Sequence, residues 1–145
     1  MKNHFKVTVL GASGRMGSQI IKRVNESPNI DLYSVVEHKG HNWIGQDCGE
    51  KLLGRENNVI VTDDLNLALA SADAVIDFTT PDTSLECLKI CADTNTAHII
   101  GTTGFNARQE SKINGYAEKV VVVKAGNMSL GINILTSLVE KISSS

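Results

Sequence analysis

Short apolar runs alternate with longer stretches of helical periodicity along the 145 residues of this chain. We expect six strands with helices between them, and the predicted strands span 5–10, 31–37, 59–61, 74–78, 97–100 and 120–124. Such alternation is typical of βαβ units, whose right-handed crossovers favour a parallel sheet covered on both faces. The sequence therefore predicts a single α/β domain with a Rossmann-like doubly wound sheet and the strand order 3-2-1-4-5-6.

The signals at the predicted helix ends agree with this fold. Thr80 is a suitable N-cap and is followed by Pro81, so we expect a helix from there to about Asp93. The segment 38–58 has four glycines and no clean period, and we expect a long loop with at most one helical turn. A last amphipathic helix is predicted at about 129–142, which leaves one domain over residues 1–145.

Composition excludes several classes of partner. The net charge is -2, and no apolar run approaches the roughly 20 residues of a membrane span, so we expect neither nucleic-acid nor membrane binding. The N-terminus lacks the pattern of a signal peptide, and three cysteines form no disulfide framework, so we expect a reducing cytoplasm. Cys87 and Cys91 would share a helix face and His98 follows them, but free cysteine is commonly a small buried hydrophobe. We therefore predict no metal site.

A glycine-rich segment joins the first predicted strand to the first helix, with the spacing G-x-x-G-x-x-G. Glycine allows a tight turn and a close approach of the backbone to phosphate, and a helix N-terminus offers unpaired N–H groups and a partial positive charge. Ser13 stands where the stricter G-x-G-x-x-G has glycine. A simple connecting turn is the alternative interpretation. The predicted diphosphate-binding residues are Gly11, Ala12, Ser13, Gly14, Arg15 and Met16.

An acidic residue ends the second predicted strand about 20 residues after this turn, where a carboxylate can accept hydrogen bonds from the adenosine ribose. This residue is Glu37, and His38 and Lys39 follow it. A cation beside the ribose can accept a 2′-phosphate, so the corner suits NADPH as well as NADH. A solvated strand end is the alternative.

Small and polar residues also follow the fourth, fifth and sixth predicted strands, at the same edge of the sheet. They would allow close backbone contact with a nicotinamide ring. The predicted residues of this half are Gly101, Thr102 and Thr103, with Ala125, Gly126, Asn127 and Met128.

Four motifs in this order carry a family resemblance: Gly-Ala-Ser-Gly-Arg-Met-Gly, Ile-Asp-Phe-Thr-Thr-Pro, Ile-Gly-Thr-Thr-Gly-Phe and Asn-Met-Ser-Leu-Gly-Ile-Asn. Together they resemble dihydrodipicolinate reductase, the 4-hydroxy-tetrahydrodipicolinate reductase of diaminopimelate and lysine biosynthesis. The resemblance implies hydride transfer from NADPH or NADH to a cyclic substrate. The family often has arginine directly after the acidic residue that binds the ribose, where this chain has His38 after Glu37. The resemblance therefore does not decide the preferred cofactor.

The resemblance also implies what this chain lacks. In the family, a second domain carries clustered histidines and a lysine that bind substrate and supply a proton, and it makes most of the homotetramer contacts. No segment here resembles that domain. We therefore expect no catalytic residue in this chain, no turnover by it alone, and a monomer or a weak assembly.

Two alternatives stay open from the residues alone. The chain could be the cofactor domain of another amino-acid-pathway enzyme, such as a homoserine or aspartate dehydrogenase. It could also be a stand-alone dinucleotide sensor.

Overall fold

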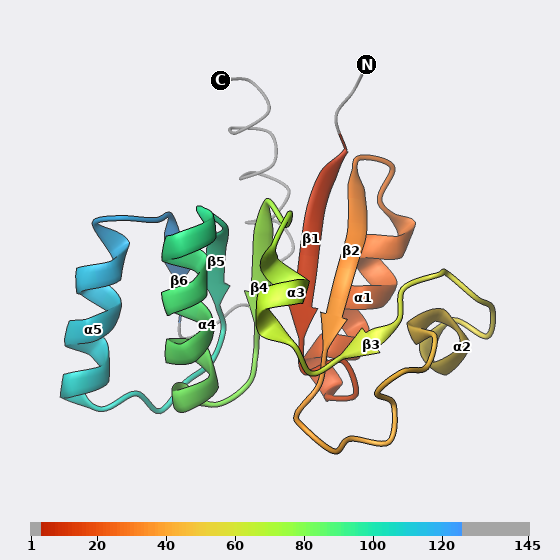
Figure 1. Ribbon diagram of the computed structural model, residues 1–145, viewed down its shortest axis with the longest axis horizontal. Helices are drawn as coiled ribbons and strands as arrows, with labels where there is room; N and C mark the ends of the chain where they lie inside the picture. Colours follow the sequence, from red (N-terminus) through yellow and green to blue (C-terminus); the bar gives the residue numbers. More distant parts are fainter. Residues whose placement is uncertain (1–3, 126–145) are drawn as a thin grey trace.

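A computed structural model describes residues 4–125. Within them, six strands form one sheet in the order β3-β2-β1-β4-β5-β6, and every neighbouring pair is parallel (Figure 1). The strands are β1 (Phe5–Leu10), β2 (Ile30–Val36), β3 (Val61–Thr62), β4 (Ala74–Asp77), β5 (Ala97–Ile100) and β6 (Val122–Lys124). The helices are α1 (Arg15–Glu26), α2 (Cys48–Leu52), α3 (Leu65–Leu69), α4 (Pro81–Thr94) and α5 (Ala107–Ala117). The predicted doubly wound topology is confirmed.

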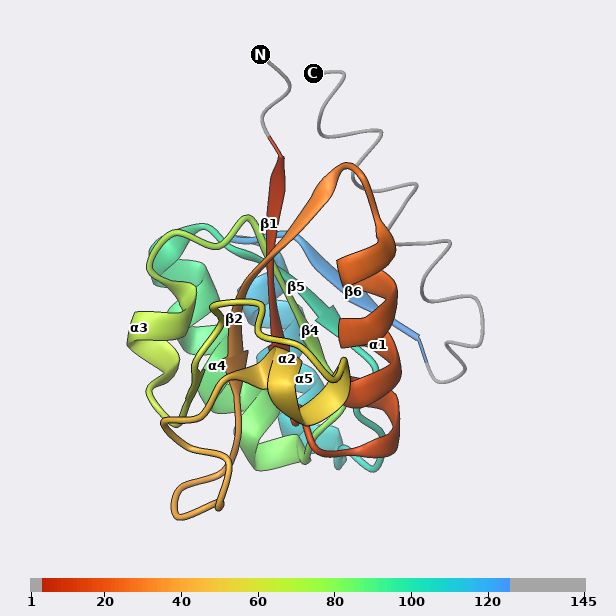
Figure 2. The same cartoon turned by 90° about the vertical axis from the view of Figure 1, so that its right-hand side faces the viewer.

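Helices cover both faces of the sheet. Figure 2 shows α1 on one side of β1 and β2, with α3 and α4 on the other. Alternation along β1 supplies both cores: Val7 and Val9 pack with α1, and Leu10 packs with α3 and α4. Central strands buried on both faces explain the nearly continuous apolar runs of the sequence.

Strand boundaries differ most from prediction at β3. The predicted strand was 59–61, but β3 is Val61–Thr62. Ile60 instead forms an isolated antiparallel bridge with Asp47, and the carbonyl of Val59 accepts from Cys48 N–H at 2.8 Å. The backbone of 59–60 is therefore committed to the preceding loop rather than to the sheet.

Most other predictions along the chain are confirmed. The 38–58 loop contains a single helical turn, α2, and Thr80 caps α4 with Pro81 in its first turn. β6 begins two residues later than expected, because Val120 N–H bonds to Tyr116 at the end of α5. No described helix is long and apolar enough to cross a bilayer. The predicted helix at 129–142 lies outside the described residues.

Candidate functional site

The turn between β1 and α1 is held by unusually close packing. Gly11 has a φ of +70° and donates its N–H to Val36 at 2.8 Å, which ties the turn to β2. A Cβ on Gly17 would lie 2.0 Å from the carbonyl oxygen of Gly11 and 2.8 Å from its carbonyl carbon. Glycine at these two positions therefore lets the first turn of α1 rest directly on the end of β1, as the sequence motif predicts.

The N-terminus of α1 differs from those of the other described helices. Side chains of Asp47, Asp64, Thr80 and Asn106 cap α2, α3, α4 and α5, each by accepting a backbone N–H. Gly14 occupies the N-cap of α1 and offers no side chain. The first-turn N–H groups of α1 consequently keep hydrogen-bonding capacity for an external acceptor, and the helix dipole favours an anion there.

Glu37 braces this turn from the end of β2. Its Oε1 accepts two hydrogen bonds from Ser13, one from the N–H and one from the hydroxyl, both at 2.7 Å. Within residues 4–125, its Oε2 accepts only the N–H of His38, at 3.2 Å. One oxygen therefore fixes the turn, while the other retains lone-pair capacity for a further donor.

The environment of Glu37 favours its ionised form. Burial alone would raise the pKa of this carboxyl, since the side chain is nearly enclosed. The hydrogen bonds from Ser13 and His38, with a smaller contribution from His41, hold the pKa below its ordinary value of 4.5. A charged acceptor thus lies next to the open helix N-terminus at neutral pH.

The topology favours a ligand site at this edge of the sheet. β1 and β4 are neighbours at the centre of the sheet, and the chain leaves them toward helices on opposite faces, α1 and α4. In doubly wound sheets, ligands bind beyond the carboxyl ends of the strands at this reversal point. The turn after β1 and the segments after β4 and β5 meet there.

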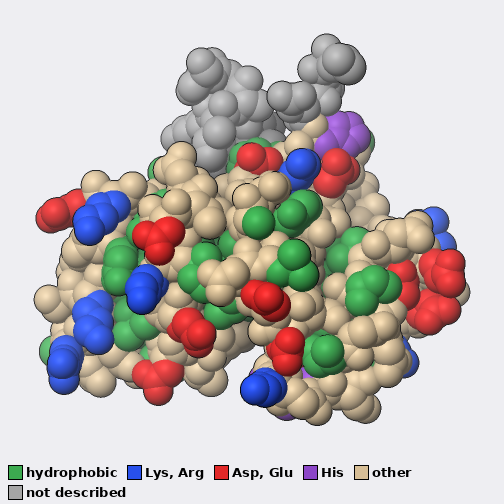
Figure 3. Space-filling view, in the orientation of Figure 1, with side chains coloured by type: hydrophobic (Ala, Val, Ile, Leu, Met, Phe, Trp, Pro, Cys, Tyr) green, Lys and Arg blue, Asp and Glu red, His purple; other side chains and the backbone are tan. Residues whose placement is uncertain are grey.

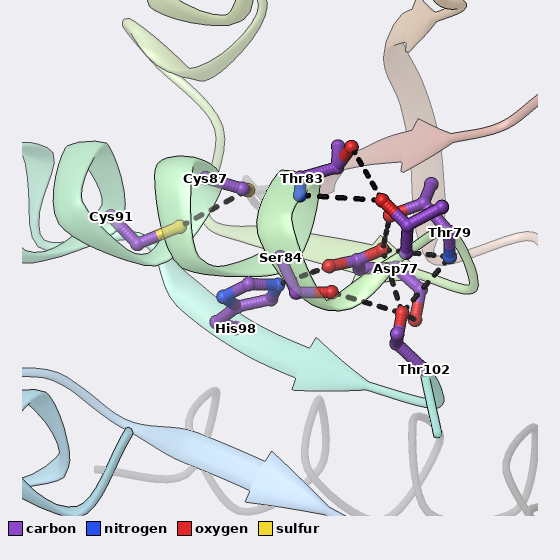
Figure 4. Close-up of polar contacts among 9 residues, drawn as sticks. Asp77, Thr79, Thr83, Ser84, Cys87, Cys91, His98 and Thr102 are labelled. Carbon is purple, nitrogen blue, oxygen red and sulfur yellow. Dashed lines mark hydrogen bonds and ion pairs between the residues drawn. The ribbon is translucent and has the colours of Figure 1, made fainter. Parts of the chain in front are cut away.

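The segments after β4 and β5 are joined by a buried polar network (Figure 4). Asp77 Oδ1 accepts from the Thr79 N–H at 3.0 Å, the Thr79 hydroxyl at 2.6 Å and the Thr102 hydroxyl at 3.2 Å. The Thr102 hydroxyl also accepts from Thr79 N–H and from Ser84, each at 2.9 Å. The Thr102 side chain is therefore used internally, so a cofactor contact from this residue would come from its backbone.

Gly101 has a different structural role from the turn glycines. A Cβ there would lie 2.2 Å from the ring of Phe78, so the ring covers the glycine directly. Its N–H donates to Asp77 at 2.8 Å, which continues the β4–β5 pairing by one residue. Thr103, in contrast, is exposed.

The predicted site residues thus fall into three groups. The turn residues and Glu37 are adjacent, with Ala12 buried in the core and Arg15 and Met16 exposed. The second group, after β5, lies on the same sheet edge, and Ala125 is partly buried after β6. The third group, Gly126, Asn127 and Met128, lies outside the described residues.

Two features at or near the site were not predicted. His41 forms an edge-to-face ladder with His38 and Trp43, at centroid distances of 5.0 and 5.5 Å, beside Glu37.

The second feature is a buried pair. His98 donates from Nε2 to Asp77 Oδ2 at 3.0 Å, and both side chains are fully buried. Burial would raise the pKa of Asp77, but the bonds from His98 and Thr79 hold it below its ordinary value. The sequence signal that could have revealed this pair is an ionisable residue within each of two apolar strands, Asp77 in β4 and His98 in β5.

Sequence comparison matches residues 5–128 to a family model described as "Dihydrodipicolinate reductase, N-terminus". A curated relative from Ruegeria sp. (strain TM1040), named 4-hydroxy-tetrahydrodipicolinate reductase, is 44% identical over 136 residues. That match covers 94% of this chain and 51% of the relative. The chain therefore spans about half the length of the curated relatives it matches.

Solved structures give the same family and a broader fold group. A dipicolinate-bound dihydrodipicolinate reductase from Paenisporosarcina sp. TG-14 has a TM-score of 0.68 and 25% identity, covering 89% of this chain and 49% of that one. A homoserine dehydrogenase from S. aureus has a TM-score of 0.63 at 15% identity, covering 83% of this chain and 32% of the other. The second likeness shows a shared fold alone.

Proposed function

The chain belongs to the family of the dihydrodipicolinate reductase N-terminal domain, and from this premise we propose that it is the NADPH- or NADH-binding part of a 4-hydroxy-tetrahydrodipicolinate reductase. The observation that carries the proposal is the uncapped start of α1, packed against β1 at the reversal point of the sheet and flanked by Glu37. The match to the family favours this function over the other dehydrogenases and the sensor considered from sequence.

The residues present fit a dinucleotide. The free N–H groups of the first turn of α1, with the backbone of 11–14, would hold the diphosphate. Oε2 of Glu37 would accept from a ribose hydroxyl, since Oε1 is already occupied by Ser13. The bound nicotinamide supplies the hydride, and the protein supplies its position and surroundings.

The nicotinamide half of the site would lie at the ends of β5 and β6. Gly101 and Thr102 present backbone there, held by the Asp77 network. We propose that Thr103, Ala125, Gly126, Asn127 and Met128 complete this half. Backbone contacts from such segments orient a carboxamide without adding side-chain bulk.

Cofactor choice would be decided beside Glu37. His38 and Lys39 are exposed next to the Glu37 carboxylate, and a 2′-phosphate there would meet the positive charge of Lys39. Both NADPH and NADH are therefore proposed cofactors, with Lys39 as the residue that favours NADPH.

Substrate reduction would need more than this chain. The relatives are about twice as long, and we propose that the part beyond this chain's match binds substrate, supplies the proton and forms a homotetramer. The chain alone would bind cofactor as a monomer or a weak assembly, in the cytoplasm. On the face in Figure 3, acidic and basic side chains are interspersed. Nucleic-acid binding depends on clustered basic groups, so we propose no nucleic-acid partner.

Calorimetric titration of the chain with NADPH and NADH tests the proposal. We expect one site per chain, and Glu37→Gln should weaken NADH binding by on the order of 10- to 100-fold, because a hydrogen bond to a charged acceptor is worth about 1.5–3 kcal/mol. Glu26→Gln, at the far end of α1, is the matched control and should bind as wild type. Equal affinities of wild type and Glu37→Gln would refute the assigned role of Glu37.

A further inference from the structure

Two thiols and an imidazole form a buried cluster between α4 and the sheet. Cys87 and Cys91 are four residues apart on α4, His98 lies on β5, and all three are fully buried. The two sulfurs are 3.8 Å apart, and they and one ring nitrogen of His98 all lie within 4.8 Å of one another. Figure 4 shows these three side chains together, next to Asp77. Atoms of the types that bind soft and borderline cations therefore converge on one small volume.

The imidazole is oriented for ligation. Its Nε2 lies 3.0 Å from the Asp77 carboxylate oxygen Oδ2, so a neutral imidazole carries its proton on Nε2 and its lone pair on Nδ1. Nδ1 is buried and has no hydrogen-bond partner in the described part of the chain. Metal-ligating histidines usually donate their other N–H to a carboxylate or carbonyl, which is the arrangement found here. The orphaned nitrogen is an observation independent of the two cysteines.

We propose that Cys87, Cys91 and His98 Nδ1 bind a thiophilic d¹⁰ cation such as Zn²⁺, with Asp77 holding the imidazole from outside the ligand set. The proposal revises the sequence-based expectation that the two cysteines only fill the core. It rests on this cluster alone and does not depend on the dinucleotide site.

The spacing of the sulfurs suits such an ion. Two thiolates bound tetrahedrally at about 2.3 Å lie about 3.8 Å from each other, the separation already present between Cys87 and Cys91. A nitrogen ligand at about 2.0 Å would lie about 3.5 Å from each sulfur. The His98 ring nitrogen that lies within 4.8 Å of the sulfurs would have to approach them by up to about 1.3 Å.

A bound ion would join α4 to β5. Through Asp77 it would also be linked to the segments that follow β4 and β5. Asp77 Oδ1 accepts from Thr79 and Thr102, while Oδ2 accepts from His98. The ion would thereby fix the carboxylate that organises the segments after β4 and β5. Three protein ligands leave the fourth position of a tetrahedral ion to a small ligand such as water. Because all three residues are fully buried, a substrate could not reach that position, and we infer a structural role.

A second group must be distinguished in any test. Glu37, His38 and His41 also offer ligand atoms within 4.8 Å of one another, but His38 is exposed and no thiol is present. The matched control for the thiol cluster is Cys48, a buried cysteine that packs on the opposite face of the sheet with α1 and has no sulfur neighbour in the described residues.

Metal titration of the tag-free, reduced and chelator-treated chain tests the proposal. With Zn²⁺ and a competing indicator, we expect one tight equivalent that survives in Cys48→Ala and His41→Ala and is lost in Cys87→Ala and Cys91→Ala. The ion should also raise the Tm of wild type and of Cys48→Ala, but not of Cys87→Ala. A tight equivalent retained in Cys87→Ala, or absent from wild type, would overturn the site.

Cobalt substitution keeps the test decisive if a cysteine variant does not fold. Co²⁺ bound to the wild-type chain should show thiolate-to-metal charge-transfer absorption and the visible bands of a tetrahedral ion. Co²⁺ that binds without thiolate absorption would contradict the proposal, since only oxygen and nitrogen ligands would then be involved.

Discussion

Replacing Gly17 by alanine should destabilise the protein strongly, although alanine is the better helix former. The added Cβ would lie 2.0 Å from the carbonyl oxygen of Gly11, and real Cβ contacts essentially never fall under 3.0 Å. The helix and the turn must therefore separate by at least 1.0 Å, the difference between these two distances. The opposing atoms belong to backbone, so no flexible side chain can move aside.

The magnitude follows from the contacts that such a separation disturbs. Overpacking costs about 1–3 kcal/mol, and here it falls at the upper end because backbone opposes backbone. The shift also strains the Gly11–Val36 and Ser13–Glu37 hydrogen bonds, each worth about 1 kcal/mol. The higher helix propensity of alanine offsets about 1 kcal/mol of this destabilisation. We expect a net loss of about 3 kcal/mol in the free energy of unfolding.

Gly115 provides the matched control. It also lies inside a helix, α5, but a Cβ there would meet nothing within 4 Å. Gly115→Ala should therefore stabilise the chain by about 0.5–1 kcal/mol. Urea unfolding of the two variants should give opposite signs, and NADH binding should weaken only in Gly17→Ala. A Gly17→Ala protein as stable as wild type would refute the close-packing argument.

Other predictions concern the network around the site. Lys39→Ala should weaken NADPH binding several-fold and leave NADH binding nearly unchanged, as measured by calorimetry. Thr102→Val should cost about 1–3 kcal/mol in urea unfolding, because the Ser84 hydroxyl loses an acceptor and the buried Asp77 Oδ1 loses a donor; no loss would contradict the network. The pKa of Glu37 is lower in the folded chain, so its contribution to stability is present above pH 4.5 and is lost as pH falls through the lower folded value. Wild type and Glu37→Gln should accordingly converge in unfolding free energy under acid, and a constant difference would count against this.

The topology was accessible from sequence because it follows from periodicity. Six apolar runs separated by helical stretches, with right-handed crossovers, leave few arrangements, and the order through β1 and β4 was predicted. Exact strand limits were less accessible. The bridge between Asp47 and Ile60 depends on how the 38–58 loop folds back, which no local pattern encodes.

The sequence placed the glycine turn and Glu37 next to each other, as they lie in the structure, but it did not predict how they are bonded. The motif located the turn and Glu37, yet spacing could not show that one carboxylate oxygen is occupied by Ser13. The side chain of Thr102 points into the interior because Asp77 is buried beside it, a contact between residues 25 apart in the chain. The Asp77–His98 pair likewise depends on the register of β4 against β5.

A crystal structure of the chain with NADH tests the central claim most directly. We predict diphosphate density over the first turn of α1, within hydrogen-bond distance of the backbone N–H groups there, and a ribose hydroxyl on Oε2 of Glu37. A dinucleotide bound elsewhere, with the start of α1 left to water, would contradict the account.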